Sequence, residues 1–265
     1  MEDAPLRIIQ ISDMHLFAEE GRVLLGVNTE ESFQAVIDHV QQHMNNKDLI
    51  ILSGDISQDA SESAYIRVAD LMKKMNVPVY WVAGNHDDPN IMARIYPYET
   101  ISNHRHIVLE NWHIILLNSH KPKVVEGYLA QSELNYLQHC LQTYPEHYAI
   151  IVFHHQPIPV GCRWLDNLWL TNAKEFWQII SLYPQVKTIL FGHVHQEFQQ
   201  QVNGVACYSA PSTCIQFHRK QDEFGLENLP QGYRWIDLYA DGHLKTGVER
   251  LAVYSGVFDS DAKGY

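Results

Sequence analysis

Runs of apolar residues alternate with helix-spaced apolar positions over the first third of the chain. Two stretches have helical spacing: one begins after Asn28, which forms an N-cap signature with Glu31, and the other covers residues 62–75. Continuous apolar runs around them predict buried strands at residues 6–11, 49–52 and 77–82. This alternation is typical of parallel strands joined by right-handed crossovers.

The rest of the chain predicts strands of both orientations. Further strands are predicted at residues 149–153 and 186–191, and helices at 131–143 and after an N-cap at Asn172. Paired β-rich runs around turn residues predict hairpins within residues 106–118, 198–209 and 234–251. We expect the region from residue 198 onward to be antiparallel. The predicted fold class is α/β, with two mixed sheets packed face to face and helices outside, a four-layer α-β-β-α sandwich.

Composition and charge limit the possible partners. One globular domain is expected over residues 1–254, followed by a loosely held tail of small and polar residues at 255–265. The formal net charge of −12 argues against a surface that coats nucleic acid or binds anionic membranes. The acidic start is unlike a signal peptide, and no apolar stretch approaches the length of a membrane span. Four cysteines without a C-x-x-C pair are typical of free thiols, so we expect a cytoplasmic protein without nucleic-acid or membrane partners.

Five short polar motifs each follow a predicted strand. They are Asp13-Met14-His15, Gly54-Asp55, Gly84-Asn85-His86-Asp87, His154-His155 and Gly192-His193-Val194-His195. Sites in open α/β sheets lie beyond the carboxyl ends of the strands, so one location can gather all five. Carboxylates, an amide carbonyl and imidazoles are ligands for hard or borderline metal ions, and two such ions suffice to hydrolyse phosphate esters.

Each motif is weak evidence alone, because short polar segments after strands usually form turns. Their combined order is what favours a metal site. Asp55 follows a glycine and is the natural carboxylate to bridge two ions, whereas His155 is expected to be a supporting or structural histidine. The remaining candidates are expected to be surface or hydrogen-bonded histidines: His104, His106, His113, His120, His218 and His243.

The order of these motifs resembles the calcineurin-like metallophosphoesterase superfamily. Four other segments resemble the bacterial class III 3′,5′-cyclic-AMP phosphodiesterases within it: residues 12–17, 161–166, 211–217 and 232–234. The motifs are specific for the superfamily, and the four segments are less specific for the subgroup. The resemblance covers nearly the whole chain and implies the four-layer metallophosphoesterase fold.

The resemblance also implies a site for two metal ions, which would be iron, manganese or one of each. It assigns the first ion to Asp13, His15, Asp55 and His195. It assigns the second ion to Asp55, Asn85, His154 and His193. It makes His86 the proton donor and phosphate contact, and Asp87 the residue that orients the His86 ring. The substrate is expected to contact His15, Asp55, Asn85, His86 and His195.

The expected reaction is hydrolysis of cyclic AMP to 5′-AMP by a hydroxide that bridges the two ions, with His86 protonating the leaving 3′ oxygen. One alternative is the same site acting on another nucleotide or small phosphodiester. The other is an inactive scaffold that has this fold and only binds a ligand.

Contacts to the base and to a second subunit are less defined by the sequence. Trp164, Trp169 and Phe17 are candidates to stack on adenine, and the alternative is that they cover the edge of a sheet. Phe217 and residues 218–229 are candidates for a lid or for a dimer contact. A homodimer through strand edges of the C-terminal region is the oligomer that the sequence suggests.

Overall fold

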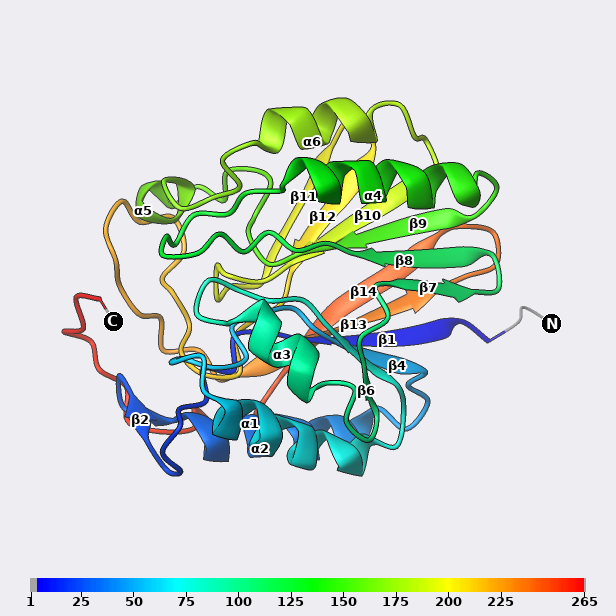
Figure 1. The fold of residues 1–265 in the computed structure, drawn as a ribbon. Coiled ribbons are helices and arrows are strands. Elements are labelled where there is room, and N and C mark those ends of the chain that lie inside the picture. The colour runs from blue at the N-terminus through cyan, green and yellow to red at the C-terminus, as the bar shows by residue number, and fades with distance from the viewer. Residues whose placement is uncertain (1–3, 265) are drawn as a thin grey trace.

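Two six-stranded sheets pack face to face within residues 4–264, the part of the chain that the computed structural model describes (Figure 1). In spatial order, the first sheet contains β14 (Leu244–Arg250), β13 (Gly232–Leu238), β1 (Leu6–Ile11), β4 (Leu49–Leu52), β5 (Val79–Trp81) and β6 (Ile101–Ser102). The second contains β11 (Phe198–Val202), β12 (Val205–Ser209), β10 (Val186–Phe191), β9 (Tyr148–Val152), β8 (Trp112–Leu116) and β7 (His106–Leu109).

Both sheets are mixed, as predicted. Strands β1, β4, β5 and β6 are parallel, and β13 and β14 extend that sheet as an antiparallel hairpin. In the second sheet β8, β9, β10 and β12 are parallel, while β7 and β11 are antiparallel edge strands. The expectation that all strands after residue 198 are antiparallel is therefore wrong for β12. The β11–β12 hairpin joins the sheet through its second strand, so β12 pairs with β10 in parallel and β11 becomes the edge strand.

Helices cover the two outer faces, which confirms the four-layer sandwich (Figure 1). On the first sheet lie α1 (Thr29–His43) and α2 (Glu62–Met72), whose last residues continue into a 3₁₀ turn at Lys73–Met75. On the second lie α4 (Gln131–Thr143) and α6 (Ala173–Ile180). The short helices α3 (Pro89–Ile95) and α5 (Arg163–Asp166) and the ribbon of β2 (Val23–Leu24) and β3 (Val27–Asn28) belong to the connecting segments.

Apolar side chains fill each interface between layers. The space between the sheets is packed by residues such as Ile51, Trp112 and Leu190, and α1 packs Phe33 and Val36 against the first sheet. Each such side chain contributes roughly 1.5–3 kcal/mol when fully buried. The rigid strands therefore hold the loops at their ends in fixed positions.

Capping explains where several helices begin. Asn28 caps α1 as predicted, because its side chain accepts a hydrogen bond from Glu31 N at 3.2 Å. Asn172 precedes α6 but does not cap it. Its amide instead pairs with the backbone of Leu129, accepting from N at 3.0 Å and donating to O at 2.8 Å. This contact fixes the segment before α4 to the start of α6.

The C-terminal segment crosses back over the β2–β3 ribbon. Val257 N donates to Gly26 O at 2.8 Å, and Gln231 Nε2 donates to Ser255 O at 3.0 Å. Tyr254 and Phe258 pack against the apolar cluster beneath α4 and α6. The predicted tail, residues 255–265, thus contacts the body of the protein at Ser255, Val257 and Phe258.

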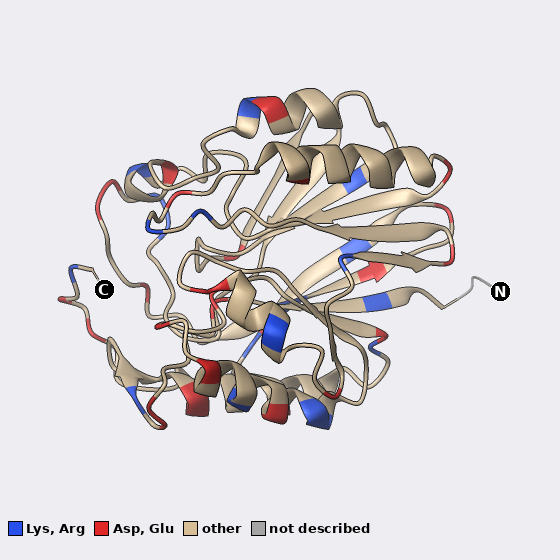
Figure 2. Cartoon of the chain, viewed as in Figure 1, with Lys and Arg blue, Asp and Glu red and all other residues tan. Residues whose placement is uncertain are grey.

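Charged residues lie mainly on the outer helices and loops, where both signs are interspersed, and the long strands are mostly uncharged (Figure 2). None of the helices within residues 4–264 combines the length and the apolar character needed to cross a bilayer. The predicted acidic start at residues 1–3 lies outside the described residues.

Candidate metal centre

All five polar motifs begin just beyond the carboxyl ends of strands, three in the first sheet and two in the second. Hydrogen bonds join the motifs within the first sheet and between the two sheets. Asp13 N donates to Gly54 O at 3.0 Å, and His193 N donates to the Asp13 Oδ1 atom, also at 3.0 Å. Gln10 Nε2 in β1 donates to Phe191 O at the end of β10 at 2.9 Å. Packing of the two sheets therefore brings residues far apart in the sequence into one site.

The first group of ligand atoms comes from Asp13, His15, Asp55 and His195. These atoms all lie within 4.8 Å of one another, and the four side chains are buried. His15 Nε2 is 3.0 Å from His195 Nε2, which in turn is 3.4 Å from Asp13 Oδ1. The four residues predicted for the first ion are therefore close enough together to bind a single ion.

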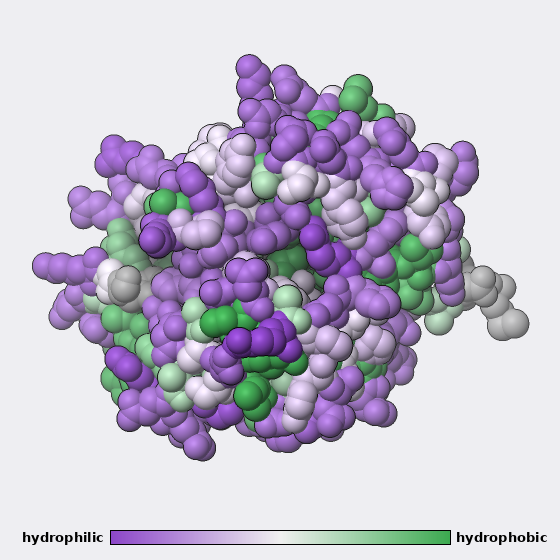
Figure 3. Space-filling view, viewed as in Figure 1, coloured by the Kyte–Doolittle hydropathy of each residue, from purple (hydrophilic) through white to green (hydrophobic). Residues whose placement is uncertain are grey.

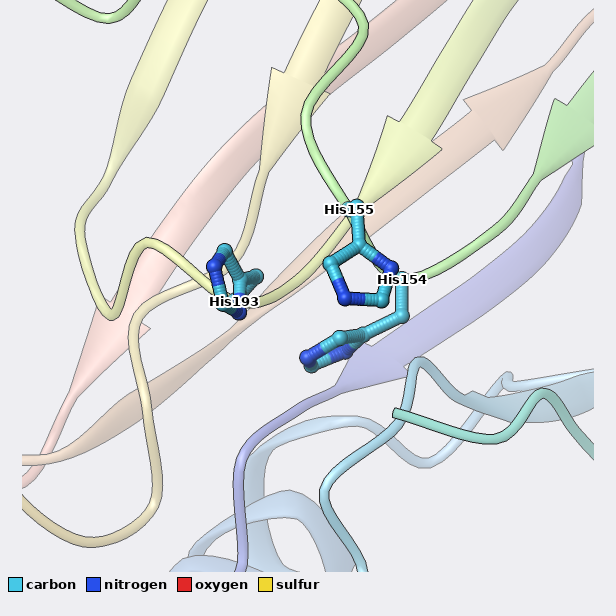
Figure 4. Close-up of side chains that lie close together, drawn as sticks. All are labelled: His154, His155 and His193. Carbon is cyan, nitrogen blue, oxygen red and sulfur yellow. The ribbon is translucent and has the colours of Figure 1, made fainter. Parts of the chain in front are cut away.

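The second group lies beside the first. The rings of His154, His155 and His193 lie close together, on segments that follow β9 and β10 (Figure 4). Asp55 Oδ2 is 3.1 Å from His154 Nε2 and 3.9 Å from His15 Nε2. Asp55 therefore touches members of both groups, which is the position that a bridging carboxylate needs.

His155 differs from its two neighbours because both of its ring nitrogens already have partners. Its Nε2 atom is 2.9 Å from Val125 O and its Nδ1 atom is 2.8 Å from Ser119 Oγ. A carbonyl oxygen only accepts, so Nε2 carries the proton and Nδ1 accepts from the hydroxyl. This arrangement fits a supporting histidine rather than a ligand.

Carbonyl oxygens fix the ring orientation of three candidate ligands. His154 Nδ1 is 2.8 Å from Ser53 O, and His195 Nδ1 is 3.0 Å from Ile215 O. His15 Nδ1 is 2.6 Å from Gln58 Oε1. Each Nδ1 must donate, so each ring presents the Nε2 lone pair to the site whenever it is neutral, as metal-binding histidines commonly do.

With these tautomers, several buried nitrogen and oxygen atoms have lone pairs that a cation could bind. Burial lowers the pKa of His15 to about 3 and that of His195 well below its usual value, so both rings are neutral at neutral pH. Their Nε2 lone pairs then face each other across 3.0 Å, where they repel. Within the described residues, Asp13 Oδ2, Asn85 Oδ1 and His193 Nε2 are buried without a hydrogen-bond partner, which costs about 1–3 kcal/mol per group. The residues present therefore fit a pair of metal ions.

The pKa values of the acidic and histidine side chains in the site also favour a bound cation. Burial raises the pKa of Asp13 to about 7. Burial acts to raise the pKa of Asp55 as well, but His154 and His86 outweigh it and hold that pKa well below its usual value. Burial acts to lower the pKa of His154, but Asp55 outweighs it and raises that pKa to about 9. Without a metal ion, Asp55 is balanced by a proton on His154, which is the proton that a bound cation would displace.

The backbone at the motifs is unusual. Five non-glycine residues of the site have positive φ angles between 47° and 68°: Asp13, His15, Asp55, His193 and His195. Side chains other than glycine adopt this left-handed conformation rarely, and such strain concentrates at functional sites. Position 84 requires glycine for a steric reason, because a Cβ atom there would lie 2.2 Å from Asp55 Oδ1.

The structure gives His86 and Asp87 different surroundings. His86 N donates to Asp55 Oδ1 at 2.9 Å, and its ring is 5.1 Å from the His15 ring, so it lies at the edge of the site. Asp87 accepts from the backbone N atoms of Ile56, Ser57 and Gly84 at 2.9–3.1 Å. The His86 Nδ1 atom is 3.2 Å from Gln58 O, and the orientation of the His86 ring by Asp87 stays a prediction from the resemblance. Asp87 joins two of the motif loops.

Two further residues were not singled out by the sequence. Gln58 lies three positions after Asp55 and contacts both His15 and His86. His120 is half-buried: burial lowers its pKa, while Asp88 and Asp55 act to raise it, which places it within electrostatic reach of the site. Neither residue has a distinctive motif around it, and only the fold brings it here.

The aromatic candidates lie around His195 and farther out. The Phe217 ring stacks on the His195 ring at 4.0 Å between centroids. Trp164 packs edge-on against Phe217 at 4.9 Å, and Phe17 packs against the Arg22 guanidinium at 4.6 Å. Trp169 packs against the apolar cluster beneath α4 and α6. Phe217 and Trp164 therefore support a candidate metal ligand.

Comparison with known proteins identifies the family of this chain. The model of the calcineurin-like phosphoesterases matches residues 6–197, which include all five motifs. The chain belongs to the calcineurin-like phosphoesterase family. This calcineurin-like phosphoesterase is 37% identical over 263 residues to the 3′,5′-cyclic adenosine monophosphate phosphodiesterase CpdA of Pseudomonas aeruginosa, covering 99% of this chain and 96% of that protein. It is 39% identical to CpdA of Haemophilus influenzae, covering 94% and 92% of the two chains.

Solved structures confirm the calcineurin-like phosphoesterase fold. A dimetal phosphatase from Danio rerio has a TM-score of 0.66 at 12% identity, over 94% of this chain and 99% of that one. GAP50, the anchor in the inner membrane complex of Plasmodium, has a TM-score of 0.68 at 13% identity, over 98% and 90%. At this low identity the likeness extends to the fold alone.

Proposed function

We propose that this phosphoesterase hydrolyses the phosphodiester of 3′,5′-cyclic AMP to 5′-AMP at a two-metal centre. The observation that carries the proposal is the nearly full-length similarity to proteins named cyclic AMP phosphodiesterases, in a chain whose metal-type donors are gathered in one buried site. Similarity over 99% of the chain includes the segments outside the metal motifs, which are the ones available to select a substrate.

In this proposal, one ion is held by Asp13, His15, Asp55 and His195, and the other by Asp55, Asn85, His154 and His193. Iron and manganese are the proposed ions, because imidazole and carboxylate donors accept several first-row metals. When bound, two such ions lower the pKa of water to provide a hydroxide nucleophile and neutralise charge on the phosphoryl oxygens.

Side chains of the protein supply the proton for the leaving oxygen and hold the proton donor in place. The 3′ oxygen of the ribose is a poor leaving group unless it is protonated, and a positioned acid typically contributes about 10²- to 10⁴-fold. We assign this role to His86, whose backbone is held by Asp55 and whose ring lies beside His15. Asp87 serves this role indirectly, because it fixes the backbone just after Asp55 and at Gly84.

Electrostatics reconcile an acidic chain with an anionic substrate. The net charge is −12, but two divalent ions would outweigh the carboxylates of Asp13 and Asp55 and leave a positive centre. A monoanionic diester is matched to such a centre. The cytoplasmic location and the homodimer stay predictions from the sequence.

The test is an assay of the purified protein with manganese against three substrates: cyclic AMP, bis-p-nitrophenyl phosphate and p-nitrophenyl phosphate. We expect cyclic AMP to be hydrolysed and 5′-AMP, not 3′-AMP, to accumulate by liquid chromatography. Hydrolysis of bis-p-nitrophenyl phosphate without hydrolysis of cyclic AMP would overturn the substrate and favour another phosphodiester. Bound metal without hydrolysis of any diester would favour the inactive scaffold.

A further inference from the structure

A cavity of about 230 Å³ lies beside the metal centre, between α3, the ends of β5 and β8, and the segment that joins β6 to β7. Its walls include Trp81, Ala83, Ala93, Arg105, Leu116 and Asn118. Figure 3 shows this face of the molecule hollowed near its centre, with apolar residues inside the hollow. None of these wall residues was assigned a role above.

The cavity adjoins the side of the site where Asn85 and His86 lie. Ala83 is two residues before Asn85, so their Cα atoms are at most about 7 Å apart. On the opposite wall, Asn118 is two residues before His120, the half-buried histidine whose pKa Asp55 acts to raise. A molecule whose phosphate lies at the metal centre can therefore extend its other end into this cavity.

Most polar groups of the walls are already in use. Asn103 accepts from Trp81 Nε1 at 3.1 Å and donates to Ala93 O at 3.0 Å, which holds the indole in place. Arg105 pairs with Glu133 and lies over the Tyr136 ring at 4.6 Å. Because this guanidinium is neutralised, the cavity has little attraction for a second anionic group.

Asn118 is the exception. Its Oδ1 atom accepts a hydrogen bond from His120 N at 3.0 Å, and within residues 4–264 no partner is found for its Nδ2 amide. The Oδ1 atom has a second lone pair, so the carboxamide presents one donor and one acceptor side by side. This is the pattern that asparagine uses to pair with the N7 and N6 positions of adenine.

We propose that this cavity, the base pocket, holds the adenine ring of the nucleotide, with Trp81 and the apolar walls against the ring and Asn118 at its polar edge. Its volume is below the roughly 300–1,000 Å³ of sites for whole drug-sized ligands, so it suits one flat ring system. The inference rests on the proposed function and names the residues that select the base. It replaces Trp164, Trp169 and Phe17 in that role.

The first test fills the base pocket. Ala93→Trp places an indole on the exposed α3 wall, and Ala252→Trp, beyond β14 at the opposite edge of the same sheet, is the matched control. Inhibition of bis-p-nitrophenyl phosphate hydrolysis is measured with 5′-AMP and with ribose 5-phosphate, which lacks the base. We expect 5′-AMP to bind roughly tenfold or more tightly than ribose 5-phosphate in the wild type and control, since a stacked base is typically worth 1–3 kcal/mol. This preference should disappear in Ala93→Trp and be retained in Ala252→Trp.

The second test changes the polar edge alone. Asn118→Asp keeps the acceptor for His120 N and removes the Nδ2 donor. We expect the preference for 5′-AMP over 5′-GMP as inhibitor to fall by roughly tenfold, because a two-bond contact to a base typically discriminates by 1–3 kcal/mol. An unchanged preference in this variant would overturn the role of Asn118.

These measurements separate the base pocket from the proposed function. If cyclic AMP is hydrolysed and Ala93→Trp has the wild-type KM for it and the wild-type preference for 5′-AMP, the base pocket is wrong and the function stands. If cyclic AMP is not hydrolysed but the preference for 5′-AMP is lost only in Ala93→Trp, the base pocket stands and the reaction is different.

Discussion

At the scale of single residues, the strongest evidence for bound metal is a pair of nitrogen atoms. His15 and His195 each donate through Nδ1 to a fixed oxygen, so their Nε2 lone pairs meet at 3.0 Å in a buried site. Two neutral rings with these tautomers repel each other at this distance. A cation bound by both nitrogens turns the repulsion into coordination.

His86 gives the sharpest prediction at this scale. We expect His86→Ala to lower kcat for cyclic AMP by about 10²- to 10⁴-fold, because it removes a proton donor. Metal content by elemental analysis should stay close to the wild-type value, since the His86 ring belongs to neither group of candidate ligand atoms. Loss of metal in this variant would contradict the assigned role and make His86 part of the metal centre.

Gly84 tests whether the position of Asp55 matters. We expect Gly84→Ala to lose most metal and activity, because the added Cβ would lie 2.2 Å from Asp55 Oδ1 and 2.4 Å from Asp55 N. Gly225→Ala is the matched control, since its nearest contact is the flexible end of Gln221 at 2.8 Å. Equal metal content in the two variants would show that Asp55 can shift without cost.

The candidate ligand side chains could be predicted from the sequence, whereas most of the hydrogen-bond partners that orient these side chains could not. The five motifs stand out because each joins rare polar residues to an apolar run. The oxygens that orient the rings, Ser53 O and Ile215 O, are backbone atoms and carry no sequence signature. The resemblance assigns Asp87 to the His86 ring, and it gives no sign of the three backbone N–H groups that donate to this carboxylate.

At the scale of elements, β7, β8 and the segment after α4 surround a histidine unconnected with the metal centre. His113 in β8 is fully buried, and its Nδ1 atom is 2.9 Å from His106 Nε2. Burial lowers its pKa to about 4, with smaller contributions from His106 and His147. The folded state therefore keeps this ring neutral.

This burial predicts a pH dependence of stability. The unfolded chain binds a proton on His113 near pH 6.5 and the folded chain only near pH 4, so stability is complete above about pH 6.5 and falls as the pH drops towards 4. Between pH 7 and pH 5, we expect the free energy of unfolding to fall by about 2 kcal/mol less in His113→Phe than in the wild type, measured by urea unfolding. His104→Phe, at an exposed position, is the control and should follow the wild type. Parallel curves for all three proteins would contradict a depressed pKa.

Element prediction succeeded where local patterns decide the structure. The long apolar runs of β1, β4, β9 and β10 and the helical spacing of α1 and α4 are local signals, and all of these elements are present. The seven-residue α3 was missed because it is too short to show a period, although Asp88 caps it and Pro89 begins it. The orientation of β12 was mispredicted because its pairing with β10 depends on the sheet and not on neighbouring residues.

At the scale of the whole molecule, the site joins the two halves of the sandwich. Asp13 and Asp55 follow strands of the first sheet, whereas His154 and His193 follow strands of the second. Bound ions would therefore hold the sheets together at one edge, and ligand binding to the folded state alone raises its stability.

Removal of metal should consequently destabilise the fold. At a metal concentration about 1,000 times Kd, binding contributes about 4 kcal/mol, so we expect chelation to lower the Tm by roughly 10 °C in scanning calorimetry. Asp55→Asn, which weakens both ion sites, should show a lower Tm and almost no further change with chelator. A Tm that does not respond to chelation in the wild type would argue against ions that join the sheets.

The central claim is that two ions share Asp55 between the sheets, and anomalous X-ray scattering from crystals grown with manganese tests it most directly. We expect two anomalous peaks per chain, one in contact with Asp13, His15 and His195, the other with Asn85, His154 and His193, and both in contact with Asp55. A single peak, or two peaks of which only one contacts Asp55, would contradict it.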